Sequence, residues 1–225
     1  MSPLTRRGVQ LAVIVLLQGI CLFAPAGTLA WPAAWWYLGG YVVLVGVGAL
    51  LLMPHHREVI TERSRGTHDA KTWDRWVTTG MAIASFGLLV IAGFDQRWGW
   101  TPPWPAWALP VGIGLFAAGY AVVLWAMWAN PFFAQGVRIQ TERGHSTIST
   151  GPYRVIRHPG YLGMATSMLG AALLLGSSYA WICVALYLAL LIARTDLEDR
   201  TLHAELPGYA AYSSTVKHRI LPGIW

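Results

Sequence analysis

The chain alternates long uncharged apolar segments with short charged ones. Four segments each hold about 20 apolar or small residues, which is enough to cross about 30 Å of hydrocarbon. They span residues 9–30, 33–53, 77–93 and 107–129. This pattern predicts four membrane-spanning helices, arranged as two hairpins, before residue 130.

A further apolar region, residues 161–193, carries no charge and is interrupted near its middle by Gly176-Ser177-Ser178. We expect two short helices joined by a tight turn, the second continuing out of the membrane through the charged residues after Ala193. The expected fold class is therefore all-α. It is a polytopic membrane protein of four spans followed by a helical hairpin, with five to six membrane helices in all.

We expect residues 1–225 to form a single membrane domain. Residues 1–129 would supply the four-helix region, and residues 130–225 the polar motifs, the hairpin and the tail. Neither polar segment is long enough to enclose a hydrophobic core of its own.

Charge sharpens this picture. Charged residues make up 12% of the chain, against about 25% in a soluble domain. Of the 16 Lys and Arg residues, Arg97 alone falls in a loop on the opposite side of the expected topology. The positive-inside rule then places the basic side in the cytoplasm, and in a bacterium the protein would lie in the inner membrane. Topology and contact with anionic lipid explain the basic excess, so no nucleic-acid partner is expected.

Three other features favour simple explanations. The apolar run after Arg6-Arg7 is similar to an export signal, but a second span follows at once, which favours a retained first helix. Cys21 and Cys183 lie inside apolar segments and are expected to pack there. The His55-His56 pair has no third ligand at a useful spacing, so no metal site is expected.

The densest polar motif stands directly before the last hairpin, from Gly151 to Gly163. Ionisable groups at the boundary of a membrane helix are functional candidates. The two X-Pro steps, at Pro152 and Pro159, each predict a bend. Arg157 and His158 would then precede a helix start, whose free N–H groups and partial positive charge suit a carboxylate.

A second polar cluster follows the hairpin. The hairpin should return Glu198 and Asp199 to the membrane side that holds Arg157 and His158. Arg194 shares a helix face with Glu198. Such an acidic pair suits a ribose diol, an amine or a sulfonium, and the alternative is a surface salt-bridge network of little energetic value.

The tail carries a helical spacing. Tyr209, Tyr212, Val216 and Arg219 lie near i, i+3, i+7 and i+10. A short amphipathic helix would either cover a pocket or anchor the tail to the membrane surface. Arg219 could bind a phosphate or carboxylate as a fixed cation.

These motifs occur in an order that resembles the integral-membrane methyltransferases. The matching elements are Gly151-Pro152-Tyr153, Arg157-His158-Pro159-Gly160-Tyr161-Leu162-Gly163, the pair Glu198-Asp199 with Leu202, then Tyr209 with Tyr212, and Arg219 with Pro222. That family includes isoprenylcysteine carboxyl methyltransferases and phosphatidylethanolamine N-methyltransferases. The resemblance covers about the last 90 residues, and it implies a methyltransferase that uses S-adenosyl-L-methionine and releases S-adenosyl-L-homocysteine.

The resemblance also implies residue roles. The catalytic group would be Arg157, His158 and Glu198. The cofactor would contact Tyr153, His158, Pro159, Tyr161, Gly163, Glu198 and Asp199. The acceptor would contact Arg194, Tyr209, Tyr212 and Arg219. Asp199 stands where the family has a second Glu, one methylene longer, which puts its contact in question.

The methyl acceptor stays open between a prenylated-cysteine carboxylate, the family-like choice, a phospholipid amine and a thiol. A lipophilic acceptor would enter from the bilayer, and we expect the fourth and fifth spans to line that opening. Two alternatives remain beside a methyltransferase: an NADPH-dependent membrane reductase of the sterol-reductase type, and a non-enzymatic membrane sensor or assembly protein. The sequence does not predict an oligomeric state.

Overall fold

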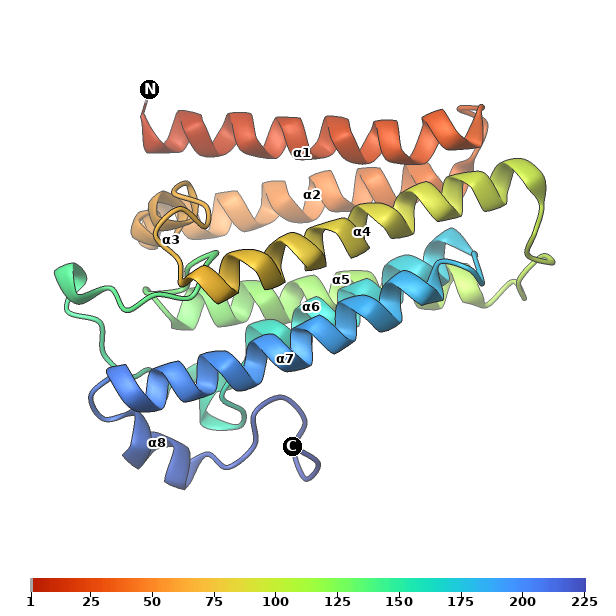
Figure 1. The fold of residues 1–225 in the computed structure, drawn as a ribbon. Helices are drawn as coiled ribbons and strands as arrows, with labels where there is room; N and C mark the ends of the chain where they lie inside the picture. The colour runs from red at the N-terminus through yellow and green to blue at the C-terminus, as the bar shows by residue number, and fades with distance from the viewer. Residues whose placement is uncertain (1) are drawn as a thin grey trace.

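The computed structural model describes residues 2–225, and in this range every regular element is helical, as predicted (Figure 1). The long helices are α1 Pro3–Ala26, α2 Pro32–His55, α4 Thr72–Trp98, α5 Ala108–Ala129, α6 Pro159–Leu175 and α7 Trp181–Glu205. The short ones are α3 Arg57–Arg63, α8 Tyr209–Thr215 and the 3₁₀ turns η1 Thr141–Arg143 and η2 Gly151–Arg154.

Helices α1, α2, α4 and α5 are each long and apolar enough to cross a membrane, which confirms the four predicted spans. Large apolar side chains such as Leu50, Ile83 and Ile182 are well exposed on the bundle, as expected where lipid replaces water. The chain is a multi-pass membrane protein.

The predicted hairpin is formed by α6 and α7. Helix α6 has 17 residues, and Gly176, at φ 69°, ends it in the left-handed conformation that glycine adopts freely. Helix α7 has 25 residues and continues beyond its apolar half through the charged residues, as expected. The bend at the first X-Pro step forms η2, and at the second His158 becomes the N-cap of α6 with Pro159 in its first turn.

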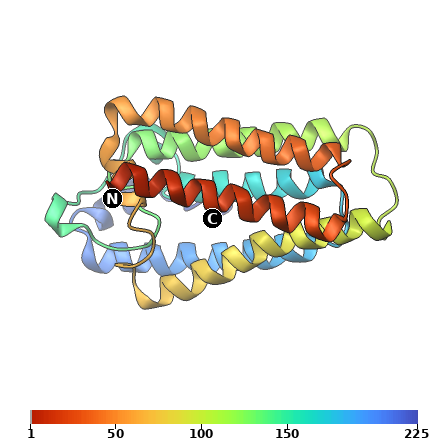
Figure 2. The same cartoon turned by 90° about the horizontal axis from the view of Figure 1, so that it is seen from above.

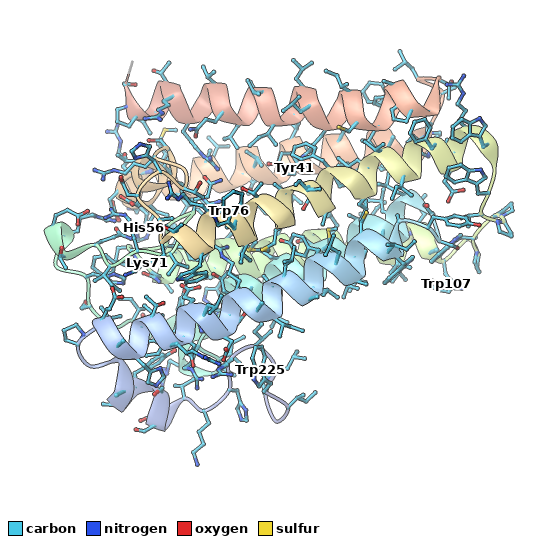
Figure 3. All side chains as sticks on the ribbon, in the orientation of Figure 1. Tyr41, His56, Lys71, Trp76, Trp107 and Trp225 are labelled. Atoms are coloured by element: carbon cyan, nitrogen blue, oxygen red, sulfur yellow. The ribbon has the colours of Figure 1, made fainter. Side chains whose placement is uncertain are left out.

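The charged segments gather at one end of the bundle. Figure 1 shows the N-terminus, α3, the segment between α5 and α6, and α8 at that end. In Figure 3, His56 and Lys71 lie there, while Trp107 lies at the opposite end. Lys71 and Glu205 form an ion pair of 2.6 Å that joins the start of α4 to the end of α7. We call this the charged end.

Helix α6 lies in the middle of the bundle. Figure 2 shows α2 and α5 to one side of it and α4 and α7 to the other. The closest seam is that between α5 and α6, where a Cβ on Gly119 or Gly163 would collide with the backbone of the facing helix. The same holds at Gly112 and Gly170, farther along the seam. Small residues of this kind let membrane helices pack backbone to backbone.

The fourth and fifth spans, α5 and α6, pack backbone to backbone along this seam, so an opening that both line would lie on another face of the pair. That they line an entrance for the acceptor stays a prediction. The tail differs from its predicted spacing, because α8 ends at Thr215 and Arg219 lies beyond it.

Candidate functional site

A cavity of about 330 Å³ opens at the charged end, between α4, α6, α7 and the segment 130–148. Eight of the predicted site residues line it: Tyr153, Arg157, His158, Tyr161, Arg194, Glu198, Tyr209 and Tyr212. The other four predicted residues, which are Pro159, Gly163, Asp199 and Arg219, are absent from its wall. Gly163 instead faces α5.

The two predicted polar patches meet in this cavity. His158 Nδ1 lies 3.9 Å from Glu198 Oε2, and the Tyr161 hydroxyl donates a hydrogen bond to the same oxygen. The rings of His158 and Tyr161 are stacked, with centroids 5.5 Å apart. Glu198 keeps 22% of its side chain exposed, so its carboxylate has room for a further donor. The structure thus confirms that the hairpin brings Glu198 to the motif before α6.

Asp199, the next residue, is surrounded by donors from the protein itself. Arg157 donates twice, through Nε and Nη2, both at 2.9 Å. The Tyr209 hydroxyl donates at 2.7 Å and Arg219 Nε at 3.0 Å. His158 Nε2 lies 3.3 Å from Oδ1. We call these five residues the Asp199 cluster.

The cluster fixes the charge of its central carboxyl group. Burial alone would raise the pKa of Asp199, but the hydrogen bonds from His158, Arg157 and Tyr209 outweigh it and hold the pKa well below its usual range. With 3% of its side chain exposed, Asp199 stays an acceptor whose oxygens are occupied. A contact between Asp199 and a cofactor stays a prediction, and the observed partners favour a structural role.

Arg157 also attaches the tail to the motif. Its Nη1 donates to the carbonyls of Val216 and Lys217 at 2.9 and 2.8 Å. The backbone N–H groups of Arg157 and His158 donate to the carbonyls of His218 and Arg219. Because its donors are used in this way, Arg157 is placed to hold the tail and to orient its neighbours.

The tail helix covers the cavity, one of the two placements considered from its sequence. The Tyr212 hydroxyl donates to the Tyr153 carbonyl at 2.7 Å, and burial raises the pKa of Tyr212 to about 12. The Tyr153 hydroxyl in turn accepts from Asn130 Nδ2 at 3.3 Å. Tyr209 and Tyr212 are both buried against this wall.

Arg194 is paired with an acidic residue that the sequence did not single out. Its Nε lies 2.7 Å from Asp74 Oδ1, and its Nη2 donates to the Gln135 carbonyl at 2.9 Å. Asp74, near the start of α4, is fully buried and also accepts the Val137 N–H at 2.8 Å. Arg194 therefore meets the cavity as a neutralised cation, with its guanidinium 5.2 Å from the Tyr161 ring centroid.

The segment 130–148 closes the cavity on a second side, and sequence reasoning assigned it no role. Gln140 is completely buried and donates through Nε2 to the Phe132 carbonyl at 2.7 Å. Its backbone N–H donates to His145 Nδ1, which stacks on Phe132. Burial, and then Arg138 and Arg143, lower the pKa of His145. A single His-containing turn offers no sequence signal for such a fold.

One comparison with known protein families matches the region that contains most of the cavity wall. The model of a family described as phospholipid methyltransferase matches residues 107–205, which run from the start of α5 to the end of α7. This region contains both motifs that meet at His158 and Glu198. No curated protein matches the chain. The match covers 99 of the 225 residues and agrees with the resemblance that the motifs gave to the integral-membrane methyltransferases.

Proposed function

We propose that this protein transfers a methyl group from S-adenosyl-L-methionine to a lipophilic acceptor, and that the donor binds in the cavity between His158 and Glu198. One observation carries the proposal. Of the two adjacent acidic residues on α7, Glu198 alone lines the cavity, beside the stacked rings of His158 and Tyr161. Its carboxylate accepts one hydrogen bond from the protein and can accept more.

The residues present fit such a cofactor. The Glu198 carboxylate can accept hydrogen bonds from a ribose diol or an amine. The same carboxylate can attract a cation such as a sulfonium. The His158 Nε2 contact with Asp199 leaves Nδ1 directed toward Glu198 and the cavity.

When bound, S-adenosylmethionine supplies an activated methyl group, so the protein's tasks are alignment, exclusion of water and handling of a proton. Helix α8 and the segment 130–148 cover two sides of the cavity, which limits the access of water to it. Arg157 positions His158 through the shared partner Asp199. If the acceptor is an amine, Glu198 or His158 Nδ1 is placed to take its proton.

The membrane setting supports a lipophilic acceptor. Methionines of α4 and α6, Met81 and Met164, line the inner part of the cavity and suit an apolar chain. A phospholipid amine, a prenylcysteine-type carboxylate and a hydrophobic thiol all remain acceptors to assay. The basic residues of the charged end support a donor site at the cytoplasmic face.

The test is methyl transfer by the purified protein in nanodiscs. Protein would be incubated with S-adenosylmethionine carrying a tritiated methyl group and with phosphatidylethanolamine, S-farnesylcysteine or dodecanethiol. We expect label in one acceptor class. E198Q should weaken binding of S-adenosylhomocysteine about 10- to 100-fold, the cost of one lost hydrogen bond to a charged group.

The matched control is E205Q, the same change on the same helix at a residue outside the cavity wall. It should leave binding of S-adenosylhomocysteine unchanged. Absence of this binding, together with absence of label in all three acceptors, would contradict the proposal. A titration with NADPH that perturbs the protein's tryptophan fluorescence would then favour the reductase alternative.

A further inference from the structure

The cavity carries one cation without a partner. Four arginines line it, and three are neutralised: Arg138 by Glu62 and Glu142, Arg157 by Asp199, and Arg194 by Asp74. The fourth is Arg63, the last residue of α3. Among residues 2–225, no carboxylate oxygen lies within salt-bridge distance of Arg63, and its guanidinium donates no hydrogen bond.

The position of Arg63 is defined by an aromatic ring. Its guanidinium carbon lies 5.6 Å from the centroid of Phe133. The same ring packs on the first turn of α6, where a Cβ on Gly160 would come within 2.8 Å of it. Phe133 therefore contacts both Arg63 and the start of the helix that carries the donor-site motif.

Arg63 is half-buried yet stays charged at neutral pH. Burial, and then the nearby Arg7, lower the pKa of its guanidinium to about 10. A sheltered cation without a counterion is unfavourable. An anion brought into the cavity by a ligand would relieve this cost.

The residues that line the rest of the cavity suit an amphiphilic ligand. Among the described residues that line it, Glu198 is the one carboxylate, and it belongs to the proposed donor site. Met81 and Ala82 of the spanning helix α4 and Met164 of the shorter apolar helix α6 line its apolar part. The cavity thus combines a carboxylate, a free cation and an apolar part.

We propose that Arg63 binds the anionic oxygens, phosphate or carboxylate, of an amphiphilic methyl acceptor. This inference rests on the proposed function and names the acceptor class for it. The guanidinium fork matches such oxygens in bidentate geometry. Because Phe133 stands between Arg63 and the start of α6, the bound anion is a group of the acceptor that does not itself receive the methyl.

The test measures binding without turnover. Thermal unfolding of the full chain in dodecyl maltoside would be followed by tryptophan fluorescence with lauroyl lysophosphatidylglycerol, lauric acid or monolauroylglycerol added. We expect the two anionic probes, and not the neutral one, to raise the melting temperature. R63Q should lose this response, with at least a tenfold weaker apparent affinity, and R63K should retain part of it.

The matched control is R65Q. Arg65 lies on the same segment, is half exposed, pairs with Glu62 and Asp69, and is not in the cavity wall. R65Q should respond like the unmodified protein. A stronger response to lauric acid than to the lysophospholipid would support a carboxylate as the source of the anion, and the reverse would support a phosphate.

Two outcomes would overturn the inference. One is an equal response to monolauroylglycerol, which would mean that the chain alone is recognised. The other is a loss of S-adenosylhomocysteine affinity in R63Q with an unchanged response to the anionic probes, which would place Arg63 in the cofactor site. If the unmodified protein binds the anionic probes through Arg63 but neither binds S-adenosylhomocysteine nor transfers methyl, the proposed function fails and the anion site stands.

Discussion

Two regions meet on α7 at adjacent residues and differ in almost every respect. At Glu198 the helix faces a cavity, and 22% of the side chain remains exposed with one hydroxyl donor bound. At Asp199 it faces the tail, where 3% is exposed and donors from Arg157, Tyr209 and Arg219 occupy the oxygens. An acidic pair in one motif is thus divided between a ligand-facing group and a structural one.

Helix geometry explains the division. Successive residues of an α-helix point about 100° apart, so neighbours cannot serve the same face. The tail returns along one side of α7 because Arg157 bonds both to Asp199 and to the carbonyls of Val216 and Lys217. The other side stays open, and this difference can be tested.

The largest effect is expected for D199N. The substitution leaves the buried Arg157 without a counterion, which costs about 3–5 kcal/mol of unfolding free energy, while Arg219 keeps its ion pair with Asp196. The melting temperature in detergent, read from the intrinsic fluorescence of the 13 tryptophans, should fall by many degrees.

E198Q is the matched comparison for D199N, since it makes the same change one residue away. Its melting temperature should stay near that of the unmodified protein, because Glu198 is partly exposed and holds no buried cation. If E198Q and D199N lower the melting temperature equally, the proposed structural role of Asp199 and ligand-facing role of Glu198 are contradicted.

A smaller effect is expected for Y209F. It removes one hydroxyl donor from Asp199 and leaves Arg157 and Arg219 in place. Loss of a hydrogen bond to a charged group costs about 2 kcal/mol. The melting temperature should fall less than in D199N, and the affinity for S-adenosylhomocysteine should remain. A loss of affinity at unchanged stability would show that Tyr209 contacts the ligand instead.

The smallest effect is one of pH. The neutral form of His145 accepts the Gln140 N–H, and the pKa of His145 is lowered in the folded protein. The unfolded chain takes up its proton first as pH falls below about 6.5, so this stabilisation is present at higher pH and declines below that value. Loss of this hydrogen bond should lower the free energy of unfolding by less than about 1 kcal/mol.

Hydrogen exchange measured at two pH values separates the segment 132–148 from the Asp199 cluster. Between pH 7.5 and 5.5, after correction for intrinsic rates, protection of segment 132–148 should decrease. The Asp199 cluster should not change, because the pKa of Asp199 is held far below this window. H145Q retains an acceptor without the titration and should abolish the pH dependence of the segment. A parallel change in both regions would contradict the assignment to His145.

Much of this architecture could be predicted from local pattern. Uncharged runs long enough to span hydrocarbon fixed the four spans, and Gly176 marked the turn of the hairpin. The hairpin was predicted to return Glu198 to the membrane side of His158, and the structure places the two side chains 3.9 Å apart. These features depend on hydrophobicity and helix periodicity, which act over a few neighbouring residues.

The choice of partners could not be predicted in the same way. Arg194 pairs with Asp74 across 120 positions of sequence, and Arg157 with Asp199 across 42. Each ion pair neutralises one arginine that could otherwise bind a ligand. That Arg63 has no carboxylate partner becomes clear only once the partners of the other three cavity arginines are known. Likewise, the sequence did not show that glycines of α5 and α6 pack these two helices backbone to backbone. The sequence by itself determined the membrane helices and the two motifs. The tertiary structure decided which charges are satisfied within the protein, because an ion pair forms only between groups that the packed fold brings within a few ångströms.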